Sequence, residues 1–354
     1  MSRPVLYPLL FASLLPSLAQ AGTADPKAKK KEVLSKVYVV EKKYRSMKGP
    51  DSTVEIKLGD GKTDELIWVT GYQAVMVGED GITPMPQEFM CHSNLDLDPR
   101  AHQKAMQNAE GGISGRLFTL SQGQFDIHFP PGFGIPMRSS EALSLTTQVL
   151  NLNHDNPKAK VRHRVTVEYL RDAEASRPMK ALFQKSVYGL VLLDGKDGRF
   201  GMSIDDSPSE AHGPGCLAGQ NASTHEYNDE FGRKFTGHWV VPPGRQVNRT
   251  PVSRLLDLPY DTTAHYIAVH LHPFAESLEL YDLTDKKTVF KSKARGYADK
   301  IGLDHVDYFE SEAGLLLYKD HEYELISVYN NTTKEEHDSM AVMYMYVLDK
   351  RFKK

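Results

Sequence analysis

The chain has 354 residues, which is enough for two domains of ordinary size, each with a core of its own. Hydrophobic residues make up 40% and charged residues 25%, a composition typical of globular proteins rather than of disordered or membrane ones. The formal net charge of -3 creates no broad field of one sign, so we expect neither nucleic acid nor an anionic membrane as a partner.

The first residues have the pattern of a secretory signal peptide. Arg3 precedes an apolar stretch over 5–18, and the sequence AQA at 19–21 provides a small-x-small cleavage site. The apolar stretch is short and interrupted by proline, which makes it a poor membrane span. We therefore predict a signal peptide over 1–21, a secreted or periplasmic location, and no stable membrane insertion after cleavage.

Most of the remaining chain has the pattern of a β protein. A basic segment, 22–36, is predicted to be a flexible tether. Beyond it, short runs of β-branched and aromatic residues alternate with Gly, Pro, Asn and Asp. Such runs indicate an all-β fold of two antiparallel β-sandwich, jelly-roll-like domains. The clearest predicted strands cover 37–40, 65–70, 164–170 and 186–193, and the best helical segment covers 98–110.

The domain boundary is predicted in the polar segment 172–178, which follows a strong strand and ends in proline. The N-terminal domain then covers 37–175 and the C-terminal domain 176–354. Composition and charge do not change across this boundary, so it depends on the segment alone.

A predicted strand within 264–280 contains a histidine pair. Side chains two residues apart in a strand share a face, so His270 and His272 point the same way and can reach one metal ion. The alternative is a pair of ordinary sandwich histidines, and the spacing alone does not exclude it.

The C-terminal segment 337–348 is rich in methionine and tyrosine. A thioether beside two imidazoles suits Cu(I), with Cu(II) accessible on oxidation. Met340 and Met343 lie on opposite faces of a strand, and alternation does not say which of them faces the histidines. A core strand that uses methionine to fill space is the alternative.

The order of these segments resembles the copper type II, ascorbate-dependent monooxygenases, the family of the peptidylglycine and dopamine monooxygenases. The resemblance implies a copper ion held by His270, His272 and Met340, activation of O2 there, a small-molecule substrate and an external reductant such as ascorbate. It also implies that Tyr344 contacts the substrate. The segments that carry it are VPPG at 241–244, HLH at 270–272, YNNT at 329–332 and DSM at 338–340, with looser matches at 131–136 and 153–157.

The chain departs from the family at the second, electron-transfer copper, which takes a His-His pair and a further histidine. At the two positions of the family's His-His pair, this chain has Cys91 and His92. At the position of the further histidine it has Asn153, and His154 is the next residue. A shift of one residue turns a strand side chain to the other face, so His154 is not a simple replacement. Either the second copper is lost, or a reorganised site uses Cys91, His92 and His154.

Export also bears on the two cysteines. In an oxidising compartment, two lone cysteines are bonded to each other more often than they bind metal, so we predict a disulfide between Cys91 and Cys216. One copper ion, rather than two, is the corresponding expectation.

The substrate positions have changed as well. Ala268 stands where peptide-amidating members of the family carry an arginine that binds a carboxylate, and Val342 stands at a substrate-contacting asparagine. A peptide ending in glycine is therefore not expected as the substrate. Two functions remain open: a copper-dependent monooxygenase, or a non-catalytic copper-binding or interaction protein on the same fold.

Overall fold

The computed structural model describes residues 25–44, 46, 48–59, 63–106, 114–192, 226–228 and 233–354. The predicted signal peptide and Cys216 lie outside these residues. No helix in the described ranges is long and apolar enough to cross a membrane.

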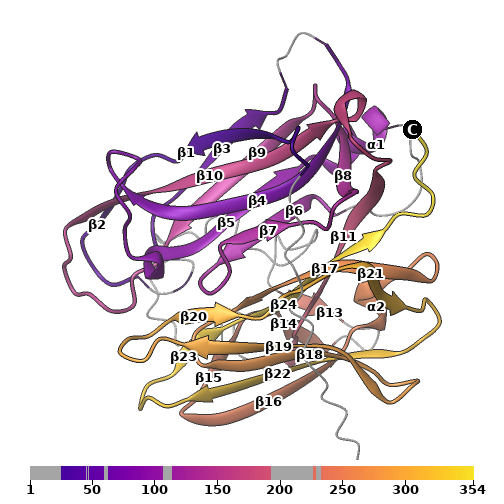
Figure 1. The fold of residues 1–354 in the computed structure, drawn as a ribbon. Helices are drawn as coiled ribbons and strands as arrows, with labels where there is room; N and C mark the ends of the chain where they lie inside the picture. Colours follow the sequence, from indigo (N-terminus) through magenta and orange to yellow (C-terminus); the bar gives the residue numbers. More distant parts are fainter. Residues whose placement is uncertain are drawn as a thin grey trace, which may run out of the picture.

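The N-terminal half is an antiparallel β-sandwich (Figure 1). One layer belongs to a large sheet in the order β1 (Lys29–Leu34), β10 (Ala159–Arg171), β4 (Leu66–Gly78) and β8 (Phe133–Arg138), with β2 (Tyr38–Val40) on β10 and β7 (Asp126–His128) on β4. The other layer has the order β3 (Asp51–Lys57), β9 (Ala142–Val149), β5 (Met90–Leu97) and β6 (Arg116–Ser121).

The C-terminal half is a second sandwich. The large sheet continues through β11 (Lys180–Tyr188), β24 (Ala341–Leu348), β17 (Thr262–Leu271) and β21 (Phe309–Leu317). The facing layer has the order β16 (Gly244–Pro251), β22 (Tyr323–Asn331), β18 (Ala275–Asp282), β19 (Lys287–Gly296) and β20 (Leu303–Val306). The halves meet in the large sheet through a short parallel pairing of β8 with β11.

Smaller elements complete the described chain. They are the strands β12 (Val191–Leu192), β13 (Glu226–Asn228), β14 (Lys234–Thr236), β15 (Trp239–Val241) and β23 (His337–Ser339), the helices α1 (Pro99–Met106) and α2 (Ser253–Leu256), and the 3-10 turns η1 (Gln87–Phe89) and η2 (Asp172–Glu174). The predicted fold class, all-β with two antiparallel sandwiches, is confirmed.

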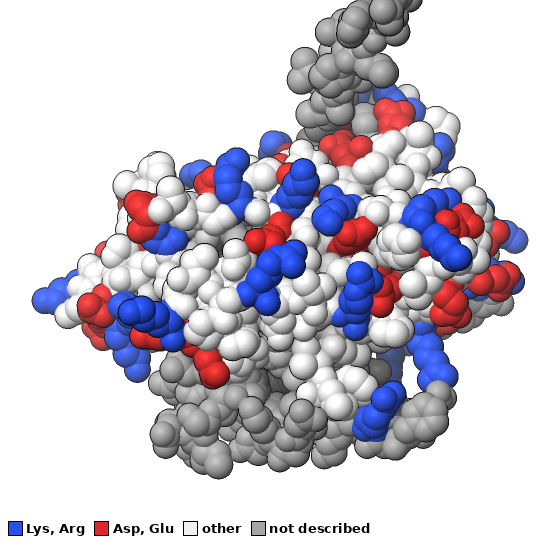
Figure 2. All heavy atoms as spheres, turned by 90° about the horizontal axis from the view of Figure 1, so that it is seen from below, with Lys and Arg blue, Asp and Glu red and all other residues white. Residues whose placement is uncertain are grey.

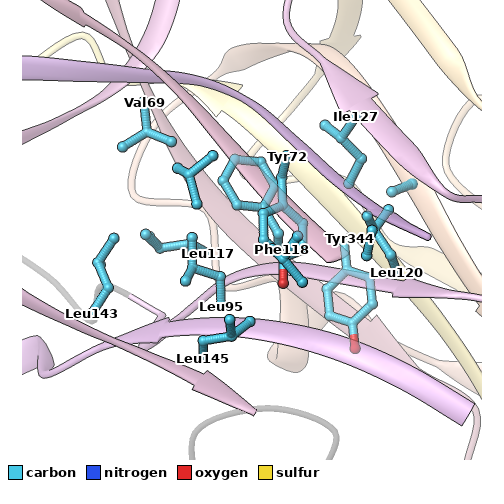
Figure 3. Close-up of a cluster of buried hydrophobic side chains, with 14 of the residues drawn as sticks. Val69, Tyr72, Leu95, Leu117, Phe118, Leu120, Ile127, Leu143, Leu145 and Tyr344 are labelled. Carbon is cyan, nitrogen blue, oxygen red and sulfur yellow. The ribbon is translucent and has the colours of Figure 1, made fainter. Parts of the chain in front are cut away.

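Strand β24 separates two buried cores, which explains its methionines and tyrosines. Its tyrosines 344 and 346 pack with the N-terminal core, where Figure 3 shows Tyr344 close to Tyr72 and Phe118. Met343 and Met345 point the other way, into the core of the C-terminal sandwich. Because successive strand residues alternate faces, a strand between two cores must be apolar on both sides.

Two local predictions are wrong. The predicted flexible tether contains β1, which pairs with β10 along its whole length and places Lys30 2.8 Å from the Glu168 carboxylate. Basic composition hid the strand, because lysines on an edge strand reach solvent while the backbone pairs. The strand predicted over 186–193 is interrupted: β11 ends at Tyr188, and β12 pairs with another sheet.

The outer face of the C-terminal sheet carries mixed charge, and Figure 2 shows basic and acidic side chains interspersed over the visible face. Cross-strand ion pairs account for part of this pattern. Arg249 lies 2.6 Å from Glu324, and Lys291 lies 2.9 Å from Glu279. This mixture gives the sheet face no extended patch of one sign.

Candidate metal centre

The histidine pair lies at the end of β17, on the side that faces the N-terminal sandwich. His270 belongs to the strand and His272 follows its last residue; both are buried. Their ring centroids are 5.2 Å apart, with the rings nearly perpendicular. The two imidazoles are thus neighbours, as their spacing in the sequence predicts.

The pairing of β17 with β24 shows which methionine lies on the same face of the sheet as the histidine pair. His270 is opposite Val342, and Leu271 is opposite Ala341. Met340 belongs to the same buried cluster as Val342, whereas Met343 packs in the other core. Met340 is therefore the methionine on the histidine side.

Tyr329 links the backbone of Met340 to that of His272. Its hydroxyl donates a hydrogen bond to the Met340 carbonyl at 2.5 Å and accepts one from the His272 backbone N–H at 3.4 Å. The direct β17–β24 pairing ends one residue earlier, at Leu271 and Ala341. The hydroxyl thus links the two chain segments where the sheet ladder stops.

Asp338 orients the His272 ring. Nδ1 of His272 lies 3.2 Å from the Asp338 carboxylate and 3.3 Å from the Asp338 carbonyl oxygen. Burial lowers the pKa of His272, but the hydrogen bond and charge of Asp338 outweigh it, so the pKa lies above its ordinary value. With Nδ1–H donated to Asp338, Nε2 is the atom available to a metal, and in the described chain it contacts the Ser46 hydroxyl at 3.4 Å.

His270 is held in the same manner by a neutral partner. Its Nδ1 lies 2.9 Å from the Ser121 hydroxyl, and its Nε2 has no hydrogen-bond partner in the described chain. Burial, together with the nearby His272 and His92, holds the pKa of His270 well below its ordinary value. A neutral imidazole is the form that binds metal ions.

A small cavity of about 30 Å³ adjoins the two rings. At about 10–15 Å³ for each water, it has room for roughly two waters. Residues of both sandwiches line it: Ser46, Cys91, Ser121, Gln122, Leu150, Leu152, His270, Leu271, His272, Pro273, His337 and Asp338. Tyr344, the predicted substrate contact, is not among them and lies in the apolar cluster of Figure 3.

Cys91 reaches this cavity through an irregularity in β5. The pairing of β5 with β9 skips from Met90 to His92, which leaves Cys91 as the extra residue of a bulge. A bulge bends its strand and re-aims the side chain. Cys91 is 6% exposed and lies near enough for its charge to act on His272.

The predicted second-site residues do not assemble. His154 lies 2.8 Å from the buried Glu88 carboxylate, and its side chain is half exposed. In the described ranges, Cys91, His92 and His154 do not bring three ligand atoms within 4.8 Å of one another. In this arrangement His154 pairs with Glu88 rather than joining a cluster with Cys91 and His92.

Asn153 instead joins the two sandwiches. Its amide donates to the Ile301 carbonyl at 2.9 Å and accepts from the Ile301 N–H, also at 2.9 Å. Beside it, Leu303 N–H donates to Gln122, and Lys300 pairs with Glu88. We call these four contacts, which join residues 300–303 to Glu88, Gln122 and Asn153, the interdomain clasp. Asn153 thus makes a structural contact between the two sandwiches.

A second cluster of potential metal ligands is explained by hydrogen bonds and ion pairs among its own residues. Within the described residues, only Asp282, Asp285 and His321 place three such ligand atoms within 4.8 Å of one another. Asp282 already accepts from the Asp285 N–H at 2.9 Å and lies 2.8 Å from His321 Nδ1, while Lys287 pairs with Asp285. These contacts close the β18–β19 hairpin without an ion.

The sequence patterns missed two contributors, Asp338 and Ser121, and they placed Cys91 in a second copper site or in a disulfide rather than at this cavity. Asp338 lies within the DSM segment, so a search for a carboxylate near the third ligand could have found it. Nothing in the sequence pairs Ser121 with His270. His238 is a further neighbour, with its ring centroid 6.3 Å from that of His272.

Comparisons with known proteins give little beyond architecture. No family model and no curated protein matches the chain. The STIV MCP structure matches with a TM-score of 0.32 and 9% identity, covering 91% of this chain and 96% of that one. PBCV-1 VP54, fitted into a reconstruction of the virophage Sputnik, matches with a TM-score of 0.33 and 8% identity, covering 95% and 98%.

A third similar structure is the peptide-N(4)-(N-acetyl-β-D-glucosaminyl) asparagine amidase, with a TM-score of 0.34, 7% identity and coverage of 90% and 96%. At identities and TM-scores this low, no role of these proteins is transferred to the chain. None of the three is a copper monooxygenase, so that resemblance stays a proposal.

Proposed function

We propose that the chain is an exported copper protein that binds one ion through Nε2 of His270, Nε2 of His272 and the sulfur of Met340. The observation that carries the proposal is the arrangement of the two imidazoles. Each is buried and has Nδ1 engaged by a neighbour; Nε2 of His270 has no partner in the described chain, and Nε2 of His272 has only a long contact of 3.4 Å with the Ser46 hydroxyl. A thioether on the same face completes a donor set that favours copper over zinc.

When bound, copper would supply one-electron redox chemistry and activation of O2, as the family resemblance implies. The chain's own residues would fix the geometry. Asp338 holds the His272 tautomer, Ser121 orients His270, and Tyr329 holds Met340 beside the pair. A small organic substrate and an external reductant such as ascorbate are the partners of this activity.

The alternative is a copper protein without turnover, and the cavity size favours it. About 30 Å³ admits water-sized groups but no organic substrate. The interdomain clasp closes the N-terminal sandwich against residues 300–303 beside this cavity. Hydroxylation would require an organic substrate to reach the histidine pair past these contacts, whereas copper binding alone does not.

The test is reconstitution with copper, followed by desalting and metal analysis. The proposal predicts close to one tightly bound copper per chain, lost in His270→Ala and in His272→Ala. Met340→Ile should weaken Cu(I) far more than Cu(II), because a thioether stabilises mainly the softer ion. His321→Ala is the matched control, since that histidine lies between β21 and β22 and pairs with Asp282 at the end of β18.

Full copper binding by both histidine variants would contradict the proposal. Oxygen uptake with ascorbate and a set of small amines and phenols then separates the two functions. Substrate-dependent uptake supports the monooxygenase, and its absence in copper-loaded protein supports the non-catalytic alternative.

A further inference from the structure

We propose that Cys91 is a fourth ligand of the same copper ion, so that one metal centre joins the two sandwiches. The inference rests on the proposed copper site at His270 and His272. It assigns Cys91 neither to the family's second copper site nor to a site with His154.

The position of Cys91 carries the first step. The bulge in β5 brings its side chain to the wall of the cavity that His270 and His272 line from the opposite sandwich. His270 is 6% exposed, borders the same cavity, and has no hydrogen bond at Nε2 in the described chain. A largely buried imidazole whose second nitrogen has no hydrogen-bond partner marks a place where a ligand is expected.

The chemistry of the four groups carries the second step. Two imidazoles, one cysteine thiolate and a weak methionine thioether form the donor set of copper electron-transfer sites. The thiol loses its proton to solvent when it binds, and no other bond changes. Four protein donors leave no open position, so this centre fits the non-catalytic alternative better than O2 activation.

The sulfur of Cys91 must move closer to the two histidines when the metal binds. In the described chain, Cys91 and the two histidines do not have three ligand atoms within 4.8 Å of one another. Rotation about the Cα–Cβ bond of Cys91 moves only its sulfur, and staggered rotamers offer three positions for it. We therefore expect the sulfur to turn toward the ion, with the β-sheet backbone unchanged.

The experiment is visible absorption and X-ray absorption spectroscopy of the full chain loaded with Cu(II) under air. The proposal predicts an intense thiolate-to-copper charge-transfer band and a short copper–sulfur distance. Cys91→Ser should abolish both while one copper stays bound through the histidines. Cys216→Ser, the matched control at the other cysteine, should keep both.

The outcomes separate this inference from the proposed function. Absence of tight copper in the unaltered chain overturns both. Tight copper without the band, or a disulfide between Cys91 and Cys216 in the intact copper-loaded protein, overturns only the role of Cys91. If Cys91→Ser fails to fold, the copper–sulfur distance in the unaltered chain and in Cys216→Ser tests the role of Cys91 by itself. A short distance in both proteins supports that role, and its absence overturns it.

Discussion

Met340 and His272 are joined through a single hydroxyl group, that of Tyr329, which donates to the carbonyl of the first and accepts from the N–H of the second. The phenol is fully buried. Burial also raises the pKa of Tyr329, so the hydroxyl keeps its proton and its capacity to donate. The position of the proposed thioether ligand thus depends on one side chain outside the ligand set.

Tyr329→Phe should therefore weaken Cu(I) binding. The change leaves a buried N–H and a buried carbonyl without their partner, at a cost of about 1–3 kcal/mol, and releases Met340 from His272. Competition with a Cu(I) chelator measures the affinity. Tyr323→Phe is the matched control, because its hydroxyl bridges the N–H and carbonyl of Tyr318 in the same way. Equal affinities in the two variants would show that Tyr329 is only structural.

Asp338→Asn should lower copper affinity by about tenfold to a hundredfold, the usual loss when the carboxylate partner of a metal-binding histidine is removed. The amide can also favour the wrong tautomer of His272 by donating to Nδ1. Asp304→Asn, at an exposed ion pair with Arg295, is the control for the loss of one charge. An unchanged affinity in Asp338→Asn would mean that His272 is not a ligand or binds through the other nitrogen.

Asn153→Ala should loosen the contact between the sandwiches without removing copper. The substitution deletes both hydrogen bonds to Ile301 and leaves its backbone groups to water. We expect faster proteolysis or hydrogen exchange in 297–303 and a lower thermal midpoint, while one copper per chain remains. Asn330→Ala, whose side chain has no hydrogen bond in the described chain, should change neither. Unaltered hydrogen exchange in Asn153→Ala would show that these contacts do not hold the two sandwiches together.

His163→Met should make the protein less sensitive to acid. Burial, with a smaller effect of His92, lowers the pKa of His163 to about 3 from the ordinary 6.5. Between these values the unfolded chain binds a proton that the folded chain does not, so stability falls as the pH drops through this window.

Lowering the pH from about 6.5 to about 4.5 costs roughly 2 kcal/mol through His163 alone, because the full slope of about 1.36 kcal/mol per pH unit is reached only below the unfolded pKa. Urea unfolding at the two pH values should show a smaller difference in His163→Met than in the unaltered chain. His305→Met, at an exposed histidine, is the control. An equal loss of stability in all three proteins would contradict a neutral, buried His163.

The fold class and the histidine face follow from the sequence because both depend on local alternation. His270 and His272 are two residues apart, so any strand places them together. Met340 and Cys91 depend on tertiary structure instead. The face of Met340 is set by its register against β17, and the direction of Cys91 is set by a bulge that no turn residue marks in the sequence.

The edge strand β1 was missed for a related reason. Its lysines resemble a disordered tether in composition, while its stability comes from backbone pairing with β10 and from contacts such as Lys30 with Glu168. Side-chain patterns detect a strand that is buried on at least one face. They do not detect one that mainly covers an open sheet edge.

The most direct test of the central proposal is a crystal structure of the copper-loaded protein with anomalous diffraction measured at the copper absorption edge. The account predicts one strong copper peak per chain, within bonding distance of Nε2 of both His270 and His272, with the sulfur of Met340 as a further ligand. A single peak at Asp282 and His321, or no ordered copper beside the histidine pair, would contradict it.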